Sequence, residues 1–66
     1  MTTTTATDRD ALNRTYGRAA VAHEKASRAL YRAELSGRFV SVRREAERAA
    51  WTALCEAKRA AESAAA

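Results

Sequence analysis

The chain has 66 residues, and its 12 lysines and arginines outnumber its 8 aspartates and glutamates, giving a formal net charge of +4. A chain this short forms one small domain that buries only about 60% of its unfolded surface, so its core is marginal without further support. One cysteine excludes an internal disulfide, and one histidine with one cysteine is too few ligands for a structural zinc site. Association with another subunit is the support that remains.

Proline is absent, glycine occurs only twice, and alanine supplies 18 of the residues, which predicts an almost wholly helical protein. The first residues contain neither the basic region nor the apolar region of a secretory signal. The sequence also lacks the stretch of about 20 apolar residues that a transmembrane helix needs. We therefore expect a cytoplasmic protein that does not use a membrane.

The first helix is expected at about residues 8–35. Residues 1–6 are mostly threonine, which is polar and β-branched, and predict a disordered tail. Thr7 and Asp10 form a weak capping box, which favours a helix start near residue 8. Apolar residues then recur in steps of four and three and form a single seam. The seam consists of Leu12, Tyr16, Ala19, His23, Ala26, Leu30 and Ala33.

A turn is expected at residues 36–40, because Ser36 and Gly37 form the strongest helix stop in the sequence. Ser41 is a suitable N-cap for a second helix over about residues 41–63, with residues 64–66 as a frayed end. The seam predicted for this helix consists of Val42, Ala46, Ala49, Ala53, Ala57 and Ala60, flanked by Ala50, Leu54 and Ala61.

The two helices predict an all-α fold, an antiparallel two-helix hairpin over residues 7–63. Reversal at the turn pairs positions whose numbers sum to roughly 76, which places His23 near Ala53. Alanine allows the helix axes to approach closely but buries little apolar area. We therefore expect two hairpins to assemble as a homodimer, forming a four-helix bundle with coiled-coil packing.

Trp51 is the main candidate for a protein interface, because it lies opposite the predicted seam of the second helix. A tryptophan on an outer face is costly unless something covers it, and tryptophans are frequent interface anchors. Val40 and Cys55 lie near it on the helical wheel, and Val21 lies on the outer side of the first helix. Two alternatives stay open: the ring covers arginine stems, or the seam is placed wrongly.

A basic stripe runs along the first helix, within about 80° on the helical wheel. It consists of Arg14, Arg18, Lys25, Arg28 and Arg32. Only Glu24 opposes these five charges between residues 14 and 32, so the local balance is five minus one, or +4. Such a stripe is ordinarily a solvated helix face, but it would also suit contacts with the phosphates of a nucleic acid.

The remaining chemical groups argue against catalysis. His23 has no second ligand, so we expect a core histidine bonded to a neighbour. Cys55 has no histidine on its face to activate it. Gly17 costs the helix stability unless another backbone passes close to it.

The sequence therefore predicts a non-enzymatic helical binding module without cofactor, metal or small-molecule substrate. Its activity would be self-association and binding of a protein partner. The alternative is a small basic nucleic-acid-binding protein that uses the stripe on the first helix.

Overall fold

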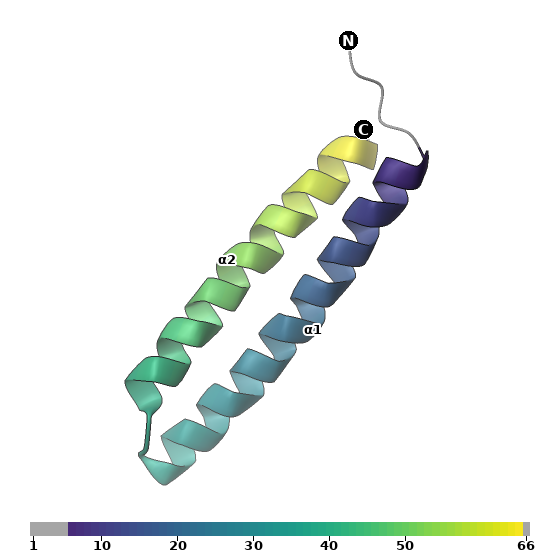
Figure 1. Ribbon diagram of the computed structural model, residues 1–66. Helices are drawn as coiled ribbons and strands as arrows, with labels where there is room; N and C mark the ends of the chain where they lie inside the picture. The colour runs from purple at the N-terminus through teal and green to yellow at the C-terminus, as the bar shows by residue number, and fades with distance from the viewer. Residues whose placement is uncertain (1–5, 66) are drawn as a thin grey trace.

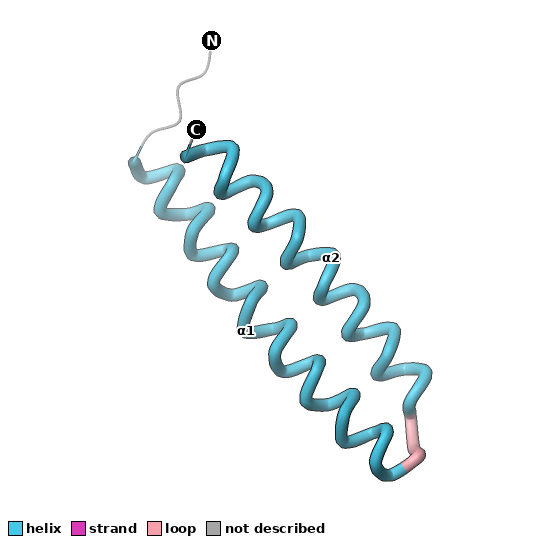
Figure 2. Tube along the Cα trace, turned by 180° about the vertical axis from the view of Figure 1, so that it is seen from behind, coloured by secondary structure: helices cyan, strands magenta, loops and turns pink. Residues whose placement is uncertain are grey.

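The computed structural model describes residues 6–65, which form two α-helices, α1 (Ala6–Ser36) and α2 (Val40–Ala65). Figures 1 and 2 show the helices side by side and antiparallel along their length. The described residues contain no strand, so the predicted helical hairpin is confirmed. The predicted tail lies outside the described residues except for Ala6, which begins α1. Of the expected frayed end, residues 64 and 65 belong to α2 and residue 66 lies outside the described range.

The seam predicted for α1 faces α2. All seven of its residues are buried or half-buried, and the most enclosed is Ala33, with 7% of its surface exposed. The residues on the opposite side of α1 are exposed. The steps of four and three therefore identified the correct face of this helix.

The face of α2 that packs against α1 is not the predicted one: the helix is rotated about its axis, so that other residues form the seam. Val42 is 66% exposed, and four of the five predicted alanines are exposed as well. Six enclosed residues of α2 follow the same steps of three and four but begin at Glu47. They are Glu47, Ala50, Leu54, Ala57, Ala61 and Ala64. This orientation places the only leucine of α2 against α1, and a leucine buries more apolar area than an alanine.

Gly37 ends α1 in the way its position predicts. Its φ is 71°, in the left-handed region that glycine adopts at little cost. Its N–H donates to the carbonyl of Ala33 at 2.7 Å, and the hydroxyl of Ser36 donates to the same carbonyl at 3.1 Å. The carbonyl of Ala33, in the last turn of α1, therefore accepts two bonds from the residues that end the helix.

α2 begins at Val40, one residue before the predicted N-cap, so the assignment of Ser41 as the N-cap is wrong. The first bond of α2 runs from the N–H of Arg43 to the carbonyl of Phe39, at 3.0 Å, which makes Phe39 the capping residue. Phe39 has a φ of 61° and is 68% exposed. Such a conformation is strained for a bulky side chain, and no side-chain oxygen is available at this position to cap the helix.

Replacing Phe39 with glycine is therefore expected to stabilise the hairpin by about 1 kcal/mol, because glycine adopts a positive φ without strain. Thermal unfolding followed by circular dichroism at a fixed chain concentration measures this. A melting temperature lower than that of the unchanged chain would show that the phenyl ring contributes more than its backbone costs.

The hairpin has a thin core. Among the described residues only Ala33 and Ala61 are buried, and no side chain is less than 2% exposed. Gly17 does not mark a close approach of another backbone, because a Cβ added there would meet no atom within 4 Å. The two helices thus touch along one line and enclose little.

Candidate interaction surface

One polar bridge crosses the hairpin near its middle. Nε2–H of His23 on α1 donates to Oε1 of Glu47 on α2 at 2.8 Å. The two side chains are 21% and 28% exposed, so the bond is partly shielded from water. The expected bond from His23 to a neighbouring side chain is confirmed, although His23 is half-buried and not part of the core. Glu47 is not predicted as the hydrogen-bond partner of His23, because the predicted seam places Ala46 and not Glu47 toward α1.

Trp51 packs on this bridge. Its ring centroid lies 5.1 Å from that of His23, and the two ring planes are tilted by 53°. The predicted position of Trp51 opposite the seam is wrong, because the seam of α2 is misplaced, which is one of the two alternatives left open by the sequence. The side-chain contacts of His23 are with Glu47 and Trp51. At 100° per residue, Trp51 lies about 90° from the centre of the observed seam, at its edge.

The position at the edge leaves Trp51 covered on one side only. It is 53% exposed, although contact with His23 restrains the ring. A restrained, half-exposed indole is the geometry of a preorganised interface anchor, because little side-chain entropy is left to lose on binding.

The other residues assigned to the interface do not all share the face of Trp51. Cys55 lies one turn further along α2, is half-buried and carries a free thiol. Val40 begins α2 and is half-buried. Val21 is 51% exposed, but on the helical wheel it lies among the basic stripe, on the side of α1 away from α2. A partner seated flat on Trp51 would therefore leave Val21 outside the contact.

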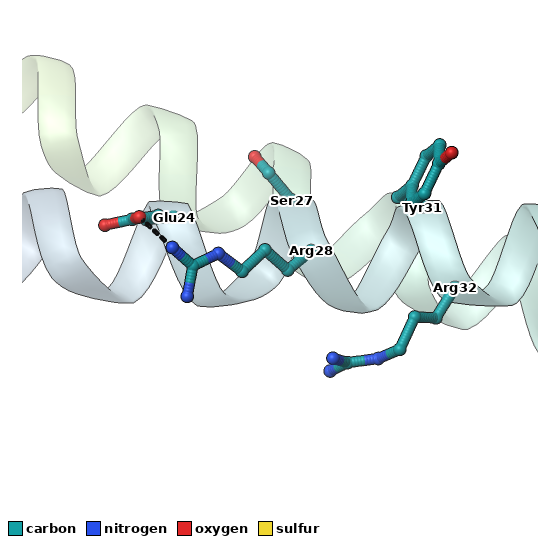
Figure 3. A pocket seen from close by; sticks show the side chains of 5 residues that line it. All are labelled: Glu24, Ser27, Arg28, Tyr31 and Arg32. Carbon is teal, nitrogen blue, oxygen red and sulfur yellow. Dashed lines mark hydrogen bonds and ion pairs between the residues drawn. The ribbon is translucent and has the colours of Figure 1, made fainter.

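All five residues of the basic stripe are exposed on the outer side of α1. Arg28 forms an ion pair with Glu24, one turn earlier on the same helix (Figure 3). Both side chains are more than half exposed, so the pair contributes little stability. Figure 3 also shows the side chains of Tyr31 and Arg32 pointing in different directions from α1. Tyr31 is 64% exposed and lines an open groove with four neighbours from α1 alone: Glu24, Ser27, Arg28 and Arg32.

A second groove lies at the end of the hairpin where the chain turns. Its lining comes from the last turns of α1, the connecting residues and the first turn of α2. Three arginines line it, Arg32, Arg38 and Arg43, together with Ser36 and Phe39. This cluster is not predicted from the sequence, because Arg38 and Arg43 lie outside the stripe and approach Arg32 only where the chain reverses.

Residues 6–65 contain no group of three or more histidine, cysteine, aspartate or glutamate side chains arranged to hold a metal ion. Neither described helix is apolar enough over a sufficient length to cross a membrane. Comparison with protein-family models, curated proteins and solved structures finds no match to this chain.

Proposed function

We propose that the hairpin is a non-enzymatic association module, and that its first partner is a second copy of the same chain. The observation that carries the proposal is the incomplete core of the hairpin. No described side chain is fully buried, whereas six large apolar side chains are more than half exposed. They are Val21, Tyr31, Leu35, Phe39, Val42 and Trp51.

The exposed area supports the same proposal. The chain exposes 5241 Å², whereas a compact monomer of 7.2 kDa exposes about 4,100 Å². The first six residues could account for at most about 900 Å² of this total, even as unfolded chain. By the same scaling, the rest exposes about 500 Å² more than a compact chain of its mass. Covering surface of that order is what a second hairpin does in a four-helix bundle.

The partner surface we assign is the flank of α2 that carries Trp51, with Cys55 one turn away. Trp51 offers a large apolar surface whose ring lies against His23, and His23 is in turn held by its bond to Glu47. Restraint of the ring before binding reduces the entropy lost on association, and a central aromatic anchor commonly supplies a large share of the binding energy. Binding of a further protein partner would use surface that the dimer leaves open.

Thermal unfolding at several chain concentrations tests the proposal. If folding and association are linked, the melting temperature rises with chain concentration, because a dimer is stabilised by mass action. Circular dichroism over a hundredfold range of concentration is sufficient. A cooperative transition at one unchanged temperature would contradict the proposal.

A second candidate function is binding of duplex DNA along the basic stripe, because its five side chains are exposed in one row of α1. Contacts with three to five phosphates would give a slope of log affinity against log salt of about −3 to −4.5. Replacing Arg14 and Arg18 with alanine is then expected to make the slope shallower by about 2. Fluorescence anisotropy of labelled duplex in a salt series measures this, and an unchanged slope would exclude the stripe.

A further inference from the structure

The groove at the turn gathers positive charge from three parts of the chain. Arg32 comes from the last turns of α1, Arg38 from the connection and Arg43 from the first turn of α2. They are 6 and 5 residues apart in the sequence, and only the closed hairpin brings them to one groove. The end of the hairpin that carries the loop in Figure 2 therefore gathers three arginines around one groove, and one of them, Arg32, also belongs to the basic stripe.

Among residues 6–65, these charges have no counter-ion. No carboxylate lines the groove, and none of the three arginines forms an ion pair with a described residue. The first turn of α2 contains no acidic residue either. Arg28 differs in this respect, since Glu24 neutralises it on the same helix. Like charges held close together repel one another, so an anion in the groove would stabilise the closed hairpin.

The groove also restrains one of its arginines. The guanidinium carbon of Arg38 lies 5.7 Å from the centroid of the Phe39 ring, within range of a cation–π contact. The N–H of Arg38 donates to the hydroxyl of Ser36 at 3.3 Å, which ties the same residue to the end of α1. The ring contact limits the positions that the Arg38 side chain reaches before a ligand arrives, and the bond to Ser36 holds its backbone.

We propose that this groove is a binding site for a phosphate group, held by the guanidinium groups of Arg32, Arg38 and Arg43. Guanidinium presents N–H donors in a planar fork that matches two oxygens of one phosphate, and three forks suit a group with several charged oxygens better than chloride. A diphosphate has more such oxygens than a single phosphate and is the better probe. The phosphate belongs either to a free diphosphate or to the backbone of a nucleic acid.

Calorimetric titration of the full chain with inorganic pyrophosphate tests this proposal, with sodium chloride of matched ionic strength as the reference. Thermal unfolding gives a second readout, because a ligand that binds only the folded hairpin stabilises it by mass action. At a pyrophosphate concentration ten times the dissociation constant, the melting temperature of the chain is expected to rise by about 5–10 °C. Replacement of Arg38 or Arg43 with alanine is expected to weaken binding at least about tenfold, because each removes a charge-assisted hydrogen bond. Arg43→Lys keeps the charge but loses the fork, so it should also weaken binding.

Arg59→Ala is the matched control. Arg59 is an exposed arginine on α2, 16 residues beyond Arg43 and thus about 24 Å further along the helix. This variant should bind pyrophosphate as the unchanged chain does. The proposal is overturned if pyrophosphate has no more effect than matched chloride, or if Arg59→Ala weakens binding as much as Arg43→Ala. Circular dichroism of each variant ensures that loss of binding is not loss of the helices.

A duplex DNA arm distinguishes the two sources of the phosphate. If pyrophosphate competes with duplex DNA and Arg43→Ala weakens both, the phosphate is part of a nucleic acid backbone. If pyrophosphate binds and duplex DNA does not compete, the ligand is a free diphosphate. Both results support the phosphate site, and each is separate from the oligomeric state of the chain.

Discussion

Replacing Leu30 with alanine is expected to lower the melting temperature by about 10 °C. Leu30 is half-buried in the seam between the helices, and the core holds few large side chains. Removing such a leucine costs about 2 kcal/mol in lost burial and packing. In a domain of this size each kcal/mol shifts the melting temperature by about 4–8 °C. Circular dichroism at a fixed chain concentration provides the measurement.

Leu35→Ala is the matched control, because Leu35 lies on the same helix but is 71% exposed. The same chemical change at this position is expected to alter the stability by no more than about 0.5 kcal/mol. Equal losses from the two variants would mean that the helices do not pack along the seam that contains Leu30.

Replacing Trp51 with alanine is expected to weaken association by at least about 2 kcal/mol, or roughly thirtyfold in the dissociation constant. The indole offers its exposed half to the partner while its other side rests on His23. Trp51 is the only tryptophan, so fluorescence reports on this site alone. In the unchanged chain its emission should shift to shorter wavelength as concentration rises, because the partner removes the ring from water.

Val42→Ala serves as the control for Trp51→Ala. Val42 is an exposed residue of α2 nine positions before Trp51, which places the two about 180° apart on the helix. It should leave association nearly unchanged. If Val42→Ala weakens the dimer and Trp51→Ala does not, the partner covers the alanine side of α2 instead of the tryptophan side.

The fold class follows from local signals that agree with one another. The residues that face α2 from α1 include Leu12, Tyr16 and Leu30, which are large and regularly spaced, so burying them decides the rotation of that helix. Gly37 is the residue that most easily adopts the left-handed conformation after a helix, and it ends α1. These features lie within a few turns of each other along the chain and need no knowledge of the partner helix.

The rotation of α2 does not follow from the same reasoning, because alanines occupy two overlapping seven-residue patterns on this helix. One contains Val42 and Ala46, and the other contains Glu47 and Leu54. The choice depends on contacts across the hairpin, where Leu54 adds apolar area and Glu47 finds His23. The place of Trp51 depends on that choice. The arginine groove at the turn depends in the same way on the reversal of the chain. Residues from distant segments meet only once the hairpin closes.

Sedimentation equilibrium of the unchanged chain at micromolar concentration tests most directly whether the hairpin completes its core with a second copy. One chain has a mass of 7.2 kDa, so the dimer has twice 7.2, or 14.4 kDa. The expected result is a mass that approaches 14.4 kDa as concentration rises and that falls back toward one chain in Trp51→Ala. A mass of 7.2 kDa at every concentration, with the helices intact by circular dichroism, would contradict the account.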